Sequence, residues 1–172
     1  HLPLKSPLSH RWMVGDPRVI QSDVVLNLPK LKAHAQVRLT GAVKNLYGCV
    51  PGKRKVWWHF QAHHDLDRFC DMLVENARAV SSALTVVDAV VAMEGPGPRR
   101  GTPRPVGVVV VGDDPVAVDA VLCELGGLPA AQYEVLQAAA RRGIGTPKLS
   151  AIRLVGEPLD RGPILGVSDV GP

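Results

Sequence analysis

Two valine-rich runs constrain the fold more than any other feature of this sequence. The first, LTVVDAVVAM, occupies residues 84–93, and the second extends from Val106 to Val111. Runs that are apolar at almost every position are typical of strands buried on both faces, as in a parallel sheet covered by helices. Aromatic residues make up only 4% of the chain, so aliphatic side chains must fill the core. The sequence therefore predicts a three-layer α/β fold, with a mostly parallel or mixed sheet and helices on both faces.

Helical patterns surround these two runs. Apolar residues recur every three or four positions between Asp65 and Val80, which predicts an amphipathic helix with Asp65 as its N-cap. Asp114-Pro115 starts a second helix, because aspartate suits the N-cap and proline the first helical position; Gly126-Gly127 ends it. This second helix is apolar almost all round, so we expect it to be buried. A third helix is expected over residues 131–142.

The remaining apolar runs are short, and they complete a single domain. Residues 23–28 and 151–155 are expected to be strands, while the segment EGPGPRRGTPRP is too rich in Gly and Pro for regular structure. A length of 172 residues suits one α/β domain over residues 1–172. We expect an irregular arm over 1–21, a core over 22–157 and a tail over 158–172. The first residue is not Met, which suggests a fragment of a longer chain.

Cysteine content and hydropathy indicate the compartment. Cys49, Cys70 and Cys123 are far apart and form no CxxC motif, so this chain alone is not expected to build an iron–sulfur cluster or a complete zinc site. The purely apolar runs are much shorter than the roughly 20 residues that span a bilayer. We therefore expect a soluble cytoplasmic protein with reduced thiols and no membrane contact.

The net charge of +4 is unevenly distributed along the chain. One third of the sequence contains a concentration of cations, namely Lys30, Lys32, Lys44, Lys53, Arg54 and Lys55. A local excess of positive charge of this kind predicts an anionic partner.

The segment PKLKAH places three basic side chains at alternate positions. If strand geometry continues past Leu28, then Lys30, Lys32 and His34 project from the same face. Two ammonium groups and an imidazole would bind a carboxylate or phosphate and move a proton. We therefore predict Lys32 and His34 as catalytic residues and Lys30 as an anion ligand. The alternative interpretation is a solvated basic loop.

The segment TGAVKN offers the components of an anion cradle. Thr40 supplies a hydroxyl, Gly41 a backbone that a ligand can approach closely, Lys44 a cation and Asn45 an amide. Lys44 is the third predicted catalytic residue, and Lys53 of the following KRK run is a further predicted ligand. The sequence contains no GxxxxGK[ST] or GxGxxG motif, so ATP and NAD are not indicated. In the alternative, Thr40 caps a helix and Lys44 is solvated.

The segment EGPGPRRG follows the first valine-rich run. Its residues Glu94, Gly95 and Gly97 would lie at the carboxyl end of a buried strand, where ligands of α/β proteins bind. We predict that this segment closes over the anion as a flexible lid. The alternative is that it is only a long connection.

Two carboxylates fall within apolar segments. Asp88 in the first valine-rich run and Asp119 in the apolar helix are both expected to be buried. A buried carboxylate must be paired, hydrogen-bonded or protonated, and Lys32 or Lys44 is the expected partner.

Histidines and tryptophans follow the KRK run. His59 and His63 stand at positions i and i+4 and would share a helix face, but no HExxH motif accompanies them, so we predict no metal site. Trp57 and Trp58 beside the basic run raise nucleic-acid binding as an alternative function. The charge excess is too small for us to prefer it.

Five segments in one order carry a family resemblance: NLPKLKAH at 27–34, TGAVKNLYG at 40–48, VPGKRK at 50–55, VDAVVAMEGPGPRRG at 87–101 and DDPVAVDAV at 113–121. Together they resemble the domain of unknown function 362 family, over residues 22–157. The resemblance implies little chemistry, because the activity of that family is not established. Members often carry a ferredoxin-like module, which this chain does not contain. The resemblance thus implies that an iron–sulfur cluster would sit on a separate domain or partner.

These observations lead to one main expectation and two alternatives. We expect the chain to bind a small anionic metabolite, a carboxylate or phosphate, in a basic crevice at the strand ends. Whether it also transforms that ligand is left open. One alternative is a non-catalytic module that works with a ferredoxin-type partner, and the other is nucleic-acid binding.

Overall fold

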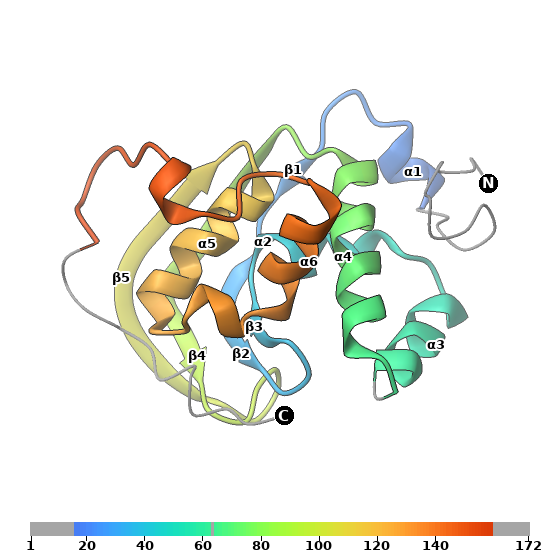
Figure 1. Ribbon diagram of the computed structural model, residues 1–172, viewed down its shortest axis with the longest axis horizontal. Coiled ribbons are helices and arrows are strands. Elements are labelled where there is room, and N and C mark those ends of the chain that lie inside the picture. The colour runs from blue at the N-terminus through green and yellow to red at the C-terminus, as the bar shows by residue number, and fades with distance from the viewer. Residues whose placement is uncertain (1–15, 63, 160–172) are drawn as a thin grey trace.

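The computed structural model describes residues 16–62 and 64–159 and has a mixed five-stranded sheet (Figure 1). The strands are β1 (Leu26–Asn27), β2 (Lys30–His34), β3 (Arg38–Thr40), β4 (Leu84–Glu94) and β5 (Thr102–Gly112). The helices are α1 (Pro17–Ile20), α2 (Ala42–Leu46), α3 (Lys53–Ala62), α4 (Leu66–Val80), α5 (Pro115–Gly126) and α6 (Glu134–Arg142). Short 3-10 turns cover Tyr47–Cys49, Ala130–Gln132 and Leu149–Ala151. The α/β class predicted from the valine-rich runs is confirmed.

Strand β4 organises the sheet. β1 and β2 pair in parallel with successive stretches of β4, β3 pairs antiparallel with β2, and β5 pairs antiparallel with β4. The two valine-rich runs are therefore the arms of one hairpin, with Val86 opposite Val111. A short connection between adjacent strands allows only antiparallel pairing, because a parallel pair needs a crossover of a dozen or more residues.

The two faces of the hairpin differ in burial. Val87 and Ala89 point into the core, whereas the alternating positions Val90, Val109 and Val111 are exposed. In the part of the chain that the structure describes, α5 packs on the buried face of the hairpin, while α2 packs against β1 and β3 (Figure 1). The predicted layer of helices on the second face is thus not found there. A valine-rich run has the same composition whether one or both faces are covered, so the pattern did not distinguish the two cases.

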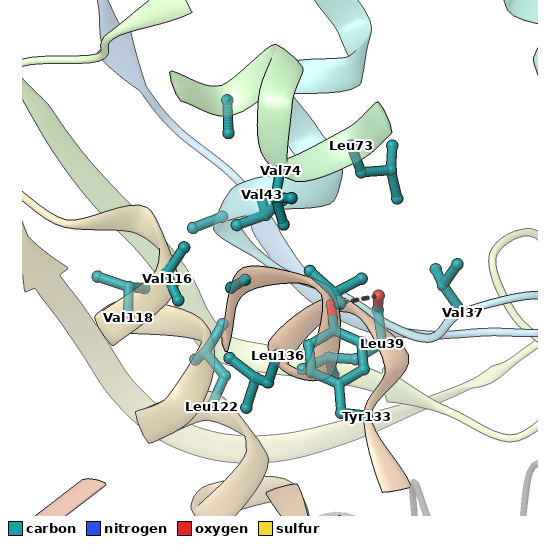
Figure 2. Packing of buried hydrophobic residues seen from close by; sticks show 14 of the residues in the cluster. Val37, Leu39, Val43, Leu73, Val74, Val116, Val118, Leu122, Tyr133 and Leu136 are labelled. Carbon is teal, nitrogen blue, oxygen red and sulfur yellow. Dashed lines mark hydrogen bonds between the residues drawn. The ribbon is translucent and has the colours of Figure 1, made fainter. Parts of the chain in front are cut away.

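The core lies between the sheet and the helices and is mainly aliphatic, as the composition predicted (Figure 2). Leu39 from β3, Val43 from α2, Leu122 from α5 and Leu136 from α6 are all essentially inaccessible to solvent. Tyr133 is fully buried beside them, and its hydroxyl donates a hydrogen bond to the Leu39 carbonyl at 3.3 Å. Helix α5 is buried almost all round because it contacts the sheet, α2 and α6.

Local capping fixes the helix ends, as the sequence predicted. The Asp65 carboxylate accepts a hydrogen bond from the Arg68 backbone N–H at 2.8 Å, at the start of α4. Asp114 accepts from the N–H groups of Val116 and Ala117 at the start of α5. Gly127 ends α5 with a φ of 64°, in the left-handed region that glycine adopts readily.

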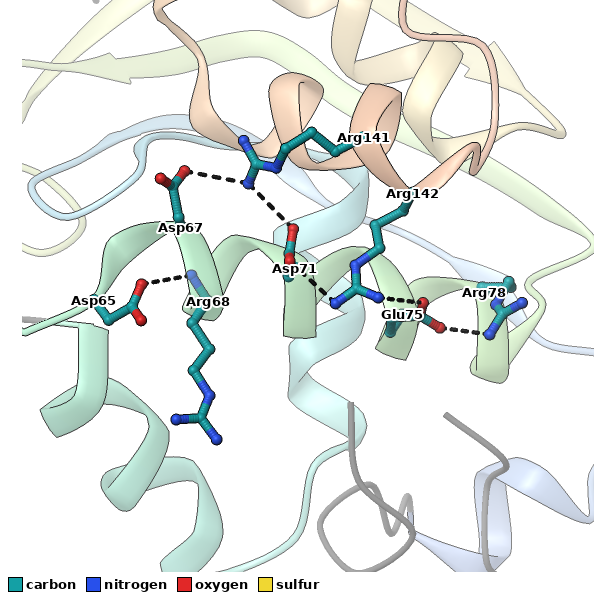
Figure 3. A network of polar contacts seen from close by, with 8 residues as sticks. All are labelled: Asp65, Asp67, Arg68, Asp71, Glu75, Arg78, Arg141 and Arg142. Atoms are coloured by element: carbon teal, nitrogen blue, oxygen red, sulfur yellow. Dashed lines mark hydrogen bonds and ion pairs between the residues drawn. The ribbon is translucent and has the colours of Figure 1, made fainter. Parts of the chain in front are cut away.

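A network of ion pairs joins α4 to α6 (Figure 3). Arg141 contacts Asp71, and Arg142 contacts both Asp71 at 3.1 Å and Glu75 at 3.7 Å. Glu75 is buried and also pairs with Arg78 at 2.5 Å. The buried carboxylate of α4 is therefore held by two guanidinium groups.

Several predicted elements differ from the structure. The expected strand over 23–28 is reduced to β1 at Leu26–Asn27, and β2 begins only after Pro29, which has no N–H to donate to a sheet ladder. β5 begins at Thr102, inside the Pro-rich segment expected to be irregular; prolines are tolerated there because β5 is paired with β4 alone. Residues 152–155 are not paired as a strand.

The predicted ends of the domain are described only in part. Residues 16–21 of the expected arm contain α1, whereas residues 1–15 and the tail beyond residue 159 lie outside the described residues. Among the described helices, none has the length and hydrophobicity needed to cross a membrane.

Candidate functional site

Lys44 is a buried lysine whose ammonium group lies against aromatic rings. It lies in the last turn of α2, and its side chain is only 8% exposed. Its ammonium nitrogen is 4.5 Å from the centre of the Tyr47 ring and 5.5 Å from that of Phe69. Within residues 16–62 and 64–159, the ammonium makes no hydrogen bond and no ion pair. The aromatic faces are thus the contacts that stabilise this buried cation.

Burial and neighbouring cations lower the pKa of Lys44. The value falls from 10.5 to about 8, first because desolvation disfavours the charged form and then because of the positive charge of Lys55. Cys70 has the opposite effect, and Lys32 lowers the pKa further. Lys44 therefore exchanges protons nearer to neutral pH than an exposed lysine does.

His34, at the end of β2, is a buried and neutral imidazole. Its Nδ1 accepts a hydrogen bond from the backbone N–H of Gln36 at 3.2 Å, so the ring proton is on Nε2. Burial, followed by the charges of Lys44, His59 and Lys32, lowers the pKa of His34 to about 4. At neutral pH this side chain is consequently a hydrogen-bond donor through Nε2–H.

His59 of α3 brings a second imidazole to the same place. Its ring stacks on that of His34 with centroids 6.5 Å apart, and it meets the Tyr47 ring edge-on at 5.3 Å. Two contacts join Gln36 to His59. Gln36 Nε2 donates a hydrogen bond to the His59 backbone carbonyl at 3.4 Å, and Gln36 Oε1 lies 2.8 Å from His59 Nδ1. That amide oxygen can only accept, so Nδ1 of His59 donates the hydrogen bond.

Lys55 and Tyr47 complete this arrangement. The Tyr47 hydroxyl donates to the Lys55 carbonyl at 2.6 Å, and the Lys55 ammonium donates to the Gly48 carbonyl at 3.1 Å. We call the set formed by these side chains the basic cluster: Lys32, His34, Lys44, Tyr47, Lys55, His59 and Phe69. None of its lysines forms an ion pair with a carboxylate of the described residues. The lysines of the basic cluster thus carry positive charge that no carboxylate of the described residues balances.

Thr40 adds an unsatisfied hydroxyl next to the cluster. It stands opposite Lys32 in the β2–β3 pairing, is 8% exposed, and its Oγ1 has no hydrogen-bond partner in the described residues. A buried hydroxyl without a partner is unfavourable unless a ligand or water satisfies it. The expected alternative, in which Thr40 caps α2, does not hold because Gly41 occupies the cap position without a side-chain bond.

The structure brings together the three predicted catalytic residues Lys32, His34 and Lys44. Lys30, although predicted to join them, is exposed and pairs with Asp88 at 2.7 Å. Asp88 was expected to be buried, and this prediction is wrong, because its side chain is 54% exposed. The separation arises because the register between β2 and β4 shifts between Lys30 and Lys32.

The other predicted ligands of α2 and α3 also lie apart from the cluster. Asn45 is exposed and donates to Asn27 Oδ1 at 2.9 Å, so its amide supports β1. Lys53 is exposed at the first position of α3.

The segment predicted as a lid is the turn of the β4–β5 hairpin. Gly97 in this turn packs against β2, where a Cβ atom would lie 2.0 Å from the Ala33 carbonyl oxygen. Only glycine fits at this distance, and the contact places the turn beside His34. In the described part of the chain, no hydrogen bond or ion pair joins Glu94 or Gly95 to the basic cluster.

Asp119 and Gly41 form a structural pair rather than a ligand cradle. The Asp119 carboxylate is fully buried and accepts hydrogen bonds from the N–H groups of Ala42 at 2.5 Å and Val43 at 3.2 Å. A Cβ atom at Gly41 would lie 2.1 Å from this carboxylate, so glycine is required. The predicted lysine partner is therefore wrong, because backbone amides of α2 satisfy the charge. Burial raises the pKa of Asp119 to about 7, although these hydrogen bonds act in the opposite direction.

Sequence reasoning missed four members of the cluster: Tyr47, Lys55, His59 and Phe69. Tyr47 follows Lys44 by three residues, so a helix assigned to 42–49 would have placed them on one face. His59 was considered only as a metal ligand with His63, which lies outside the described residues. Across the described ranges, no three metal-ligating side chains lie together. Trp58, proposed for base stacking, is buried against Trp57.

A cavity of about 600 Å³ lies elsewhere, between β5, α5 and residues 152–159. Valine side chains of β5 and α5 line it together with the charged residues Asp113, Asp114, Arg153 and Glu157, and its walls include none of the predicted site residues. We place the candidate site at the basic cluster, since none of the buried polar atoms that lack a hydrogen-bond partner in the described residues belongs to a residue that lines the cavity.

Comparisons with known proteins give matches that include this part of the chain. The model of the family described as domain of unknown function (DUF362) matches residues 2–124, which include the whole basic cluster. "Thylakoid-associated protein sll1697" from Synechocystis sp. is 46% identical over 125 residues. That match covers 73% of this chain but only 39% of the relative, so the chain spans well under two thirds of the relative's length. No solved structure matches.

Proposed function

This chain belongs to the DUF362 family, and we propose that it binds a small carboxylate or phosphate ligand at the basic cluster. The observation that carries the proposal is the ammonium of Lys44, which is more than nine-tenths buried without an anionic partner in the described residues. An unpaired buried charge is strongly unfavourable. A bound anion would supply the missing partner.

The surrounding groups suit an anion of small size. Lys32 and Lys55 add positive charge, while the Nε2–H of His34 and the hydroxyl of Thr40 offer uncharged hydrogen bonds. Hydrogen bonds between ionised donors and oxyanions are about twice as strong as neutral ones. Lys32, Gln36 and His59 are partly exposed, so we assign them to the rim through which the ligand enters.

The same geometry favours one residue for proton transfer. The pKa of His34 is lowered to about 4, so its imidazole is a weak base at neutral pH. The pKa of Lys44 is lowered to about 8, within the range useful for acid–base chemistry near neutrality. If the ligand is transformed, we assign the proton-moving role to Lys44.

We further propose that the chain acts in the cytoplasm and that any iron–sulfur cluster serving it belongs to a separate domain or partner. The support is the sparse, unpaired cysteines: Cys70 and Cys123 are buried, and Cys49 is partly buried. No cluster ligand set is available among them.

Thermal unfolding with added anions tests the binding proposal. We expect phosphate, oxalate or glycolate to raise the melting temperature of the parent protein, because a ligand that binds the native state stabilises it. The shift should persist in Lys30→Ala, whose lysine lies outside the cluster, and disappear in Lys44→Met. An equal shift in Lys44→Met, or no shift in the parent with any of these anions, would contradict the proposal.

A further inference from the structure

The surroundings of Lys44 are those of a nucleophilic amine. A lysine attacks carbon only as the neutral amine, and enzymes obtain this form by placing the side chain in an apolar pocket or beside another cation. Lys44 has both features, because the rings of Tyr47 and Phe69 cover it and Lys55 and Lys32 lie near enough to act on its charge. A site that only forms ion pairs would keep its central lysine protonated, whereas the surroundings of Lys44 favour the neutral amine.

Building on the proposed anion site, we propose that Lys44 forms a Schiff base with ligands that carry both a carbonyl group and a carboxylate, the class of 2-oxo acids. The inference names a substrate class for the same site. It also adds a covalent step to what would otherwise be simple binding.

The chemistry balances without any oxidant or reductant. The Nζ lone pair of Lys44 forms a C–N bond to the carbonyl carbon as the C–O π bond breaks, and one proton then passes from this nitrogen to the oxygen to give a neutral carbinolamine. Loss of that hydroxyl as water leaves a C=N bond, which becomes an iminium by taking one proton from solvent. The net change is one amine and one carbonyl converted to one imine and one water.

The cluster suits each part of such an adduct. The iminium retains positive charge over the Tyr47 ring, where the ammonium already lies 4.5 Å from the ring centre. The carboxylate would be attracted to Lys32 and Lys55, whose charges already act on Lys44. His34 Nε2–H is a neutral donor that can bond to the carbonyl oxygen without protonating the attacking amine.

Reductive trapping with glyoxylate tests the inference. The parent protein is incubated with glyoxylate and cyanoborohydride, which converts an imine to a stable carboxymethyl amine, and peptide mass mapping locates the label. We expect Lys44 to be labelled about tenfold faster than the exposed Lys30, Lys53 and Lys148, which serve as internal controls. Lys44→Arg retains a cation without a nucleophilic amine, so it should lose this fast labelling.

Glycolate, which has the carboxylate but no carbonyl group, separates the two proposals. If glycolate stabilises the parent and Lys44→Arg but Lys44 is labelled no faster than exposed lysines, the Schiff base is wrong and anion binding stands. If neither glycolate nor glyoxylate stabilises the parent and Lys44 is not labelled preferentially, both proposals fail. Preferential labelling that excess glycolate suppresses supports both.

Discussion

A buried charged group lies at each end of α2, and the two groups differ in whether they have hydrogen-bond partners in the described residues. At the N-terminus, the Asp119 carboxylate is met by the N–H groups of Ala42 and Val43. In the last turn, the Lys44 ammonium is buried among rings with no anion beside it in the described residues. Hence one charge holds the scaffold together, while the other is left available for a ligand.

The comparison shows why burial alone does not identify a site. Both groups have a shifted pKa, raised to about 7 for Asp119 and lowered to about 8 for Lys44, and desolvation is the leading cause in each case. What differs is the set of partners. A satisfied buried charge makes its removal destabilising, whereas an unsatisfied one makes its removal stabilising.

The largest effect is expected for Asp119→Ala. Removing the carboxylate leaves two buried N–H groups of α2 without an acceptor, so we expect a loss of about 2–5 kcal/mol in the free energy of unfolding. Denaturant titration measures it. The matched control is Asp65→Ala, an exposed N-cap that accepts one backbone hydrogen bond, from Arg68, and whose loss should be about 1 kcal/mol. Equal losses in the two variants would show that Asp119 is no more than a cap.

The opposite sign is expected for Lys44→Met. An apolar side chain of similar length removes the desolvated cation, so the free energy of unfolding at neutral pH should rise by about 1–3 kcal/mol. The same denaturant titration applies. A loss of stability would mean that Lys44 has a structural partner, and the contrast with Asp119 would disappear.

The increase in the free energy of unfolding expected for Lys44→Met should also depend on pH. The pKa of Lys44 in the folded protein, about 8, lies below its ordinary value of 10.5. The ammonium therefore destabilises the fold fully below pH 8, and this effect vanishes as the pH rises toward 10.5. The stability difference between variant and parent should shrink over that interval. The buried tyrosines and cysteines titrate in both proteins, so their contribution cancels in the stability difference between variant and parent. A difference that stays constant over this pH interval would contradict the lowered pKa of Lys44.

An intermediate effect is expected for Arg142→Ala. Arg142 is 18% exposed and contacts Asp71 and Glu75 across the α4–α6 interface. Glu75 keeps Arg78 in the variant, so the expected loss is about 1–2 kcal/mol. Arg141→Ala, which removes a more exposed guanidinium, is the control and should lose less. Urea unfolding of both variants measures these losses. If Arg142→Ala loses no more stability than Arg141→Ala, Arg78 alone is a sufficient partner for Glu75.

The smallest effect is expected for Lys30→Ala. Both partners of the Lys30–Asp88 pair are about half exposed, and such pairs contribute less than about 1 kcal/mol. Stability and anion-induced thermal shifts should match those of the parent. A loss of anion binding in this variant would return Lys30 to the site and move the ligand to the exposed face of the sheet.

The basic cluster was anticipated in part from the sequence. Lys32, His34 and Lys44 were selected because basic residues of two short segments would meet at strand ends, whereas Lys30 was selected on the same reasoning and lies elsewhere. The alternation of a strand predicts a shared face only where the register is regular, and the β2–β4 pairing shifts at this point.

The sequence by itself determined the features that depend on near neighbours. The starts of α4 and α5 follow from Asp65 and Asp114, and the end of α5 from Gly127, because a cap bonds to residues two to four positions away. The valine-rich runs likewise determined that β4 and β5 exist. The tertiary structure alone decided that these strands pair antiparallel with one face exposed. It also decided that Asp119 bonds to α2 and that His34, Lys44, His59 and Phe69 meet. Such contacts join residues far apart in sequence, and they depend on how whole elements pack, which no local pattern records.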